Sequence, residues 1–186
     1  MKYDPAKHHR KSIRLKGHDY TSPGAYFVTI CVQGRACVLG EVMDGEMQLS
    51  DEGQIAAESW VWLEEQYPYV MVDAWVVMPN HTHAIITIHD DSTGGSGTGG
   101  SRTAPTVVKR KPLGRLIGAF KTVSTKQINR MHNTPGARFW QRNYWEHIVR
   151  NQTAYQRIYQ YIQNNSACWE DDQLHPNAPP NPFNRG

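Results

Sequence analysis

The sequence predicts an α+β fold in which one antiparallel sheet has helices on one face and a further helix follows at the C-terminal end. Short runs of β-branched and aromatic residues alternate with stretches of helical hydrophobic spacing. Their order is strand, helix, strand, strand, helix, strand and terminal helix, which is the split βαβ pattern of a ferredoxin-like sheet. At 186 residues the chain has the length of one domain. Such a sheet leaves its second face open for ligands.

The first half of the chain supplies one strand, a hairpin and one helix of this pattern. Residues 25–32 are aromatic and β-branched, so they predict a buried strand. Residues 39–49 are rich in turn formers and predict a small hairpin. A helix with a regular apolar stripe then begins at the N-cap Ser50 and ends at Pro68.

The second half supplies the remaining elements. Residues 70–78 and 81–88 are apolar strands separated by a two-residue turn, so they pair as neighbours. Residues 113–131 repeat apolar side chains at helical spacing. Residues 138–141 begin the fourth strand, and residues 151–165 form the terminal helix with an asparagine at its N-cap.

Composition divides the chain into one domain with two polar ends. Residues 1–20 are a basic N-terminal arm, residues 21–170 a single domain, and residues 171–186 an irregular, proline-rich tail. Residues 91–111 are a flexible insertion rich in glycine and serine. The insertion lacks the lysine and the strand–loop–helix setting of a phosphate-binding loop, which excludes that function for it.

Cysteine usage and hydropathy indicate a cytoplasmic protein. Cys31, Cys37 and Cys168 are irregularly spaced, which argues against a disulfide framework or a cysteine-rich zinc site and suits a reducing compartment. No stretch approaches the roughly 20 apolar residues of a membrane helix. The charged N-terminus lacks the apolar run of a secretory signal. We therefore expect no membrane contact.

Positive charge is concentrated in two blocks although the net charge is only +3. Two such blocks suit a phosphate backbone, and a solvated tail and helix face are the alternative. The candidate DNA-binding residues are Arg10, Lys11, Arg14 and Lys16 in the first block and Lys121, Lys126 and Arg130 in the second.

Two histidines, His81 and His83, stand two residues apart at the start of a predicted strand. Side chains at positions i and i+2 of a strand leave the same face, so both imidazoles can reach one divalent cation. Two ordinary polar positions near a turn are the alternative. Two imidazoles alone make an incomplete site for Mg²⁺ or Mn²⁺, which prefer oxygen ligands.

The terminal helix offers a third ligand together with a nucleophile. Tyr161 and Asn165 are four residues apart, and they therefore lie one turn apart on the same helix face. The Asn165 amide oxygen can ligate a metal, and a tyrosine beside a divalent cation is a credible nucleophile. Tyrosines in amphipathic helices are usually packing residues, and this helix has three, so spacing alone does not select Tyr161.

Several ordered motifs resemble the REP-associated tyrosine transposases, which belong to the single-tyrosine branch of the HUH nuclease superfamily. The resemblance spans residues 10 to about 176. It rests on the segments 10–20, 23–29, 78–83, 139–151 and 161–165, which occur in the same order as in that family.

The resemblance implies a metal-dependent enzyme that cuts and rejoins single-stranded DNA next to REP-like palindromic hairpins through a 5′-phosphotyrosine. His81 and His83 match the metal-binding pair, Asn165 the third ligand and Tyr161 the nucleophile; the implied cofactor is a divalent metal, Mg²⁺ or Mn²⁺. The chain departs from the family at Thr82, where a bulky apolar residue is usual, and at Ser166, where proline is common. Neither change removes a reacting group.

Two other functions compete with this one. A metal-dependent hydrolase would use an activated water and leave Tyr161 structural, and a nucleic-acid-binding module would use the open sheet without catalysis. We expect a monomer or a homodimer, and in a dimer Tyr161 can act in cis or in trans.

Overall fold

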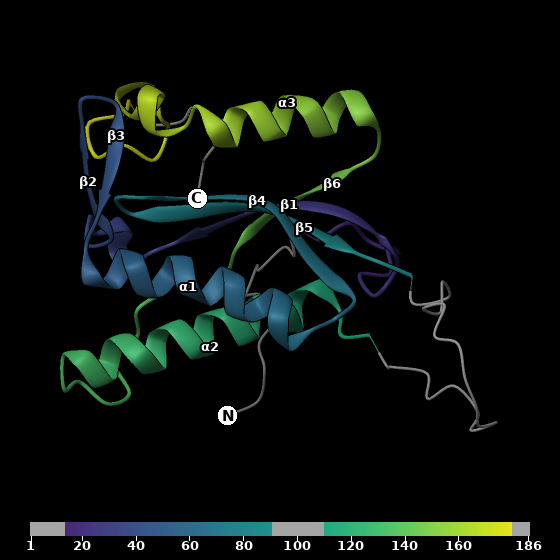
Figure 1. Cartoon of the computed structure of the whole chain (residues 1–186), viewed down its shortest axis with the longest axis horizontal. Helices are drawn as coiled ribbons and strands as arrows, with labels where there is room; N and C mark the ends of the chain where they lie inside the picture. The colour runs from purple at the N-terminus through teal and green to yellow at the C-terminus, as the bar shows by residue number, and fades with distance from the viewer. Residues whose placement is uncertain (1–13, 91–109, 180–186) are drawn as a thin grey trace, which may run out of the picture.

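The computed structural model describes residues 14–90 and 110–179, and its centre is a four-stranded antiparallel sheet (Figure 1). Its strands, in the order β4-β5-β1-β6, are β4 (Val70–Met78), β5 (His81–Ile88), β1 (Gly24–Cys31) and β6 (Trp145–Val149). β5 is antiparallel to both β1 and β4, which leaves β4 and β6 at the two edges. This is the ferredoxin-like topology that the sequence predicts.

The helices lie on both faces of this sheet (Figure 1). α1 (Asp51–Gln66) and α2 (Leu113–Met131) cover one face, and α3 (Gln152–Gln163) covers part of the other. The second face is therefore open to ligands only in part, where α3 does not cover it. Ile158 and Ile162 of α3 pack against Ala74 and Ile85, which point away from the other two helices, and burying this stripe holds α3 on the sheet.

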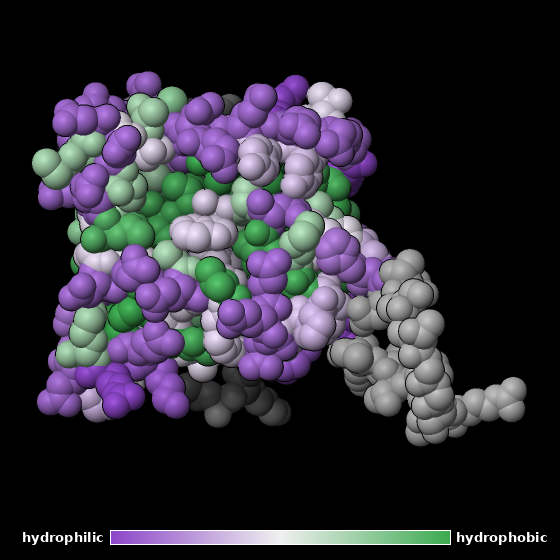
Figure 2. Space-filling view, viewed as in Figure 1, coloured by the Kyte–Doolittle hydropathy of each residue, from purple (hydrophilic) through white to green (hydrophobic). Residues whose placement is uncertain are grey.

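The main core fills the space between the sheet and the helices α1 and α2. At its centre, the rings of Trp60 and Phe120 stack with centroids 4.0 Å apart, and neither side chain is exposed. Figure 2 shows hydrophobic residues gathered at the level of the sheet, with hydrophilic residues over the outer sides of the helices. Most of the buried apolar area lies on this side, so it supplies most of the stability.

Local signals in the sequence set the ends of the helices. The Ser50 hydroxyl accepts a hydrogen bond from the backbone N–H of Gly53 at the start of α1, and the Asn151 side chain accepts one from Ala154 at the start of α3. Both residues are the predicted N-caps. α1 ends at Gln66, two residues before Pro68.

The predicted hairpin is also present. β2 (Gly40–Met43) and β3 (Glu46–Leu49) pair through a two-residue turn. Asp44 and Gly45 both have positive φ, +52° and +78°, which is the backbone of the turn type favoured between antiparallel strands.

The prediction that residues 138–141 begin the fourth strand is wrong, because β6 begins only at Trp145. Trp140 forms a single bridge with Val32, and its indole N–H donates to the Ser124 hydroxyl of α2 at 2.8 Å. The apolar character of this segment therefore reflects its packing into the main core, where Trp140 is buried and Phe139 is partly buried.

Parts of three predicted segments lie outside the described residues: 1–13 of the arm, 91–109 of the insertion and 180–186 of the tail. The described part of the tail contains the end of a short 3-10 helix, η2 (Ser166–Asp171), followed by turns. Among the residues that the structure describes, no helix is both long and apolar enough to span a membrane.

Candidate active site

The two histidines lie side by side in β5, on the sheet face that α3 covers. Both are buried, and their Nε2 atoms are 3.0 Å apart. β5 brings them together because His81 and His83 alternate with Thr82, which points to the opposite face. The strand thus aims two ring nitrogens at one point, as the i, i+2 spacing predicts.

Neighbouring side chains fix the orientation of both rings. Asn80 donates its side-chain N–H to the Leu174 carbonyl at 2.7 Å, so its Oδ1 faces His81 Nδ1 at 2.8 Å. An amide oxygen only accepts, so His81 Nδ1 carries the proton and the lone pair of its Nε2 faces His83 Nε2. His83 Nδ1 lies 2.8 Å from the Thr29 hydroxyl, on the strand that pairs with it. Such outer partners are typical of metal-binding histidines.

The histidines are neutral in this setting. Burial, together with a smaller effect of the positive charge of Arg35, lowers the pKa of His81 to about 3. Burial lowers the pKa of His83 well below its usual range as well, and the neighbouring His81 adds to this effect. Only the neutral imidazole has a lone pair for a metal, so both rings are in the ligating form at physiological pH.

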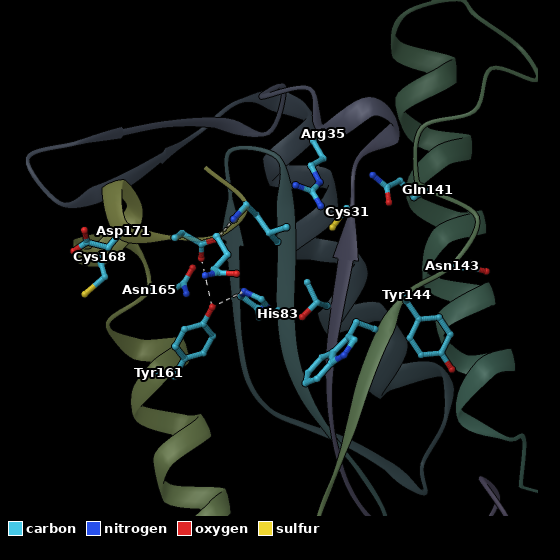
Figure 3. Close-up of a pocket in the computed structure, with 15 residues that line it drawn as sticks. Cys31, Arg35, His83, Gln141, Asn143, Tyr144, Tyr161, Asn165, Cys168 and Asp171 are labelled. Carbon is cyan, nitrogen blue, oxygen red and sulfur yellow. Dashed lines mark hydrogen bonds between the residues drawn. The ribbon is translucent and has the colours of Figure 1, made fainter. Parts of the chain in front are cut away.

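Tyr161 reaches the histidine pair from α3. Figure 3 shows its ring pointing from the helix toward His83, and its hydroxyl lies 3.2 Å from His83 Nε2. Burial, together with a smaller effect of the negative charge of Asp172, raises the pKa of Tyr161 to about 12. The ring is still 45% exposed, so a substrate can reach the hydroxyl.

Asn165 borders the same cavity (Figure 3). The predicted helix extends to residue 165, but α3 ends at Gln163, and Asn165 lies just before η2 (Ser166–Asp171). Its side chain is buried, and its Oδ1 atom has no hydrogen-bond partner among the residues that the structure describes. An unpaired buried amide oxygen is costly, because it has lost its hydration without compensation. A cation at this position would satisfy it. The structure thus brings the four residues singled out in the sequence into one site.

Asp172 is a fifth member that the sequence reasoning missed. Its Oδ2 atom accepts a hydrogen bond from the Tyr161 hydroxyl at 3.4 Å and lies 3.9 Å from His81 Nε2. The ligand atoms of His81, His83 and Asp172 all lie within 4.8 Å of one another. The carboxylate follows η2 in the irregular tail, where no periodicity marks a side chain as facing the site. The sequence could have indicated Asp172 only as an acidic residue that follows Asn165 closely.

Thr82, a departure from the family pattern, has a structural role on the other face of β5. Its hydroxyl accepts a hydrogen bond from the Trp60 indole at 3.0 Å and donates one to the Val76 carbonyl at 2.8 Å. The threonine therefore ties the strand segment between the two histidines to α1 and β4.

A cavity of about 530 Å³ opens beside the reactive groups. His83, Tyr161 and Asn165 line one side of it, and Arg35 and Gln141 lie across from them (Figure 3). This volume is in the range of small-molecule and nucleotide sites.

The candidate DNA-binding residues of the first block have different surroundings. Arg10 and Lys11 lie outside the described residues, and Lys16 is exposed. Arg14 forms an ion pair with Glu146 of β6, and its guanidinium lies 3.6 Å from the centre of the Tyr144 ring. Arg14 therefore fastens the end of the arm beside the wall of the cavity.

The second block borders a groove of about 720 Å³ between α2 and residues 133–137. Lys126 and Arg130 are exposed there. Lys121 instead donates to the backbone carbonyls of Gln141 and Asn143, both at 2.8 Å. Burial lowers the pKa of Lys121 to about 8. Since Gln141 and Asn143 also line the 530 Å³ cavity, Lys121 joins the groove to the wall of the candidate active site.

Comparisons with known proteins place the chain among relatives. No protein-family model matches it. An uncharacterized protein of Haemophilus influenzae (strain ATCC 51907 / DSM 11121 / KW20 / Rd) is 38% identical over 177 residues, which cover 94% of this chain and 97% of that protein. A solved structure of a REP-associated tyrosine transposase bound to a REP hairpin matches with a TM-score of 0.51 and 20% identity, over 84% of this chain and 72% of that one. The chain therefore belongs to the same family as the Haemophilus influenzae protein, and it has the fold of a REP-associated tyrosine transposase.

Proposed function

We propose that this protein is a metal-dependent transposase that nicks and rejoins single-stranded DNA next to palindromic hairpins, with Tyr161 as its nucleophile. One observation carries the proposal: the Tyr161 hydroxyl lies 3.2 Å from His83 Nε2, which in turn lies 3.0 Å from His81 Nε2. A phenol beside two buried ring nitrogens that face one point is the arrangement expected of a tyrosine that acts next to a bound cation. The contact lies within one chain, which supports action in cis.

The residues present suit a divalent cation such as Mg²⁺ or Mn²⁺. His81 and His83 supply neutral nitrogen donors, Asp172 a carboxylate oxygen, and Asn165 a buried amide oxygen without a partner among the described residues. Mixed imidazole and oxygen donors fit Mn²⁺ well, and Mg²⁺ favours the oxygen ligands. Such an ion would offset the charge on a phosphate and lower the pKa of the adjacent phenol.

In the proposed reaction, Tyr161 Oη forms a bond to the phosphorus of a DNA phosphate, and the bond from that phosphorus to the 3′-oxygen breaks. The phenolic proton passes to Asp172, whose Oδ2 already accepts the hydroxyl hydrogen bond, and the leaving 3′-oxygen takes up a proton. The products are a 5′-phosphotyrosine and a free 3′-hydroxyl. The 3′-hydroxyl of another strand reverses these steps, which rejoins DNA without net hydrolysis.

The hairpin substrate is proposed from the structural relative, which was solved with a REP hairpin. The α2 groove with Lys126 and Arg130 offers positive charge for the phosphates of a duplex stem. Lys121 and residues 141–144 connect this groove to the cavity that holds Tyr161. A stem in the groove would thus place the adjoining single strand near the nucleophile. Arg10, Lys11, Arg14 and Lys16 remain candidates for further contacts from the arm.

The test is the formation of a covalent protein–DNA adduct. Labelled palindromic hairpin DNA with single-stranded flanks, taken from the sequence next to the gene, is incubated with the protein and Mn²⁺ or Mg²⁺ and resolved on a denaturing gel. We expect an adduct with the wild type and none with Tyr161→Phe. Tyr159→Phe is the matched control, because Tyr159 lies on the same helix and is 36% exposed. Strand cleavage without an adduct would instead support a hydrolase that uses an activated water.

A further inference from the structure

Trp145 exposes a large aromatic surface at the rim of the candidate active site. Its side chain is 50% exposed, and it lines the same cavity as Tyr161 and Asn165. Tryptophan is usually well buried, because removing its large apolar surface from water is favourable. A half-exposed indole beside a reactive tyrosine therefore indicates a surface that a ligand covers.

The indole is held in a fixed position relative to the reactive groups. The Phe27 ring meets Trp145 edge-on, with centroids 5.7 Å apart and an interplanar angle of 74°. Phe27 also stacks on His83 at 5.2 Å and meets Tyr161 edge-on at 6.0 Å. In the sheet, Trp145 pairs with Thr29, whose hydroxyl contacts His83. Phe27 is thus in contact with the metal-ligand candidate, the nucleophile and the exposed indole.

The surroundings of Trp145 suit a flat group that belongs to a negatively charged chain. The His147 ring lies almost parallel to the indole, with an interplanar angle of 7° and centroids 6.2 Å apart, so a second flat ring stands beside Trp145 on the edge strand. Arg142, shortly before β6 in the sequence, and Arg150, directly after it, are both exposed. Aromatic faces flanked by positive charge are the features with which proteins bind single-stranded nucleic acid.

We propose that Trp145 is a stacking platform for a base of the single-stranded DNA next to the phosphate that Tyr161 attacks. This inference rests on the proposed function, and it describes how the site holds its substrate strand. Every base has a π-face, so the platform positions the strand without selecting its sequence. His147 offers a second flat ring beside it, and the two arginines hold the neighbouring phosphates.

The experiment separates base stacking from phosphate binding. Binding of a fluorescent thymidine oligonucleotide of about 20 nucleotides is compared with binding of an abasic deoxyribose-phosphate chain of the same length. Both probes are titrated in the Tyr161→Phe background, so that no strand is cut. Trp145→Ala is expected to weaken thymidine binding about tenfold, the loss of one stacked base, and to leave abasic binding unchanged. Trp145→Phe, which keeps an aromatic face, is expected to restore most of the affinity.

Trp75→Ala is the matched control. Trp75 is also a partly exposed tryptophan on an edge strand, 36% exposed, but β4 is the opposite edge of the sheet. Trp75 lies two residues before Val77 of the main core, so its side chain points to the sheet face that α1 and α2 cover. Its replacement is expected to leave binding of both probes unchanged.

Three results would overturn the platform: unchanged thymidine binding by Trp145→Ala, an equal loss on both probes, or a parent protein that binds both probes equally. None of them bears on the nucleophile, because adduct formation is measured separately with Tyr161 intact. Conversely, a missing adduct with normal base-dependent binding would reject the proposed reaction and leave the platform in place.

Discussion

The two faces of the sheet are built in opposite ways. The face under α1 and α2 is closed and mainly apolar, with Trp60 and Phe120 stacked and fully buried at its centre. The face under α3 buries polar groups, including both histidines and Asn165, and borders a cavity of about 530 Å³. Burying polar groups without full compensation costs free energy, so the first face supplies stability while the second holds the candidate active site.

β5 belongs to both faces and links them. Its alternate residues His81, His83 and Ile85 point to the α3 side, and Thr82 and Ala84 point to the main core. A rigid core therefore fixes the strand that holds the two candidate metal ligands. The comparison implies that substitutions on one face change chemistry more than stability, and that substitutions on the other do the reverse.

Among substitutions that keep Tyr161, His83→Ala is expected to have the largest effect. The loss of one nitrogen donor should lower the rate of adduct formation by about 1,000-fold or more, since a bound cation contributes several kcal/mol of charge stabilisation. Calorimetric titration with Mn²⁺ should show weakened binding. His89→Ala, which removes an exposed histidine just after β5, is the control. Wild-type rates in His83→Ala would remove the metal centre from the account.

Asp172→Asn should have the next largest effect. The amide keeps an oxygen donor but is a far weaker proton acceptor, so we expect the rate of adduct formation to fall about 100-fold. Affinity for Mn²⁺ should change much less. If Mn²⁺ binding falls as far as the rate does, Asp172 acts mainly as a ligand and another group accepts the Tyr161 proton.

Phe120→Ala tests the opposite face. Removing a fully buried ring should lower the free energy of unfolding by about 3–5 kcal/mol, which urea titration measures. At low temperature, where this variant stays folded, its rate of adduct formation should match that of the wild type. A rate loss comparable to that of Asp172→Asn would show that the two faces are not separable.

Thr82→Val is expected to have the smallest effect, and it tests whether a change on the main-core side of β5 reaches the histidines on the other side. Valine keeps the shape but leaves the buried Trp60 N–H without its acceptor, so the free energy of unfolding should fall by about 1–3 kcal/mol. Affinity for Mn²⁺ should stay within about twofold of the wild type, because the histidine partners on the other face are untouched. A larger change would assign Thr82 a role in positioning the histidines.

Sequence patterns correctly predicted the parts of the structure that are set by local or periodic features. Strand alternation places His81 and His83 on one face. Helical spacing indicated that Tyr161 and Asn165 face the same site, although Asn165 lies just past the end of α3. Apolar content misplaced the start of the fourth strand, because Trp140 packs into the core as a bridge residue rather than as part of a strand. Asp172 comes from an irregular segment, whose path depends on tertiary contacts such as the Asn80–Leu174 hydrogen bond.

The central claim is that Tyr161 forms the covalent bond to DNA, and mass spectrometry of the digested adduct tests it directly. Trypsin cleaves after Arg150 and Arg157, so Tyr155 separates from the peptide that holds Tyr159 and Tyr161. Fragmentation of that peptide then distinguishes its two tyrosines. We predict a nucleotide attached through phosphate to Tyr161, in samples prepared with Mn²⁺ and not in samples with a chelator. A nucleotide on Tyr159, on Tyr155 or on a residue elsewhere in the chain would contradict the account.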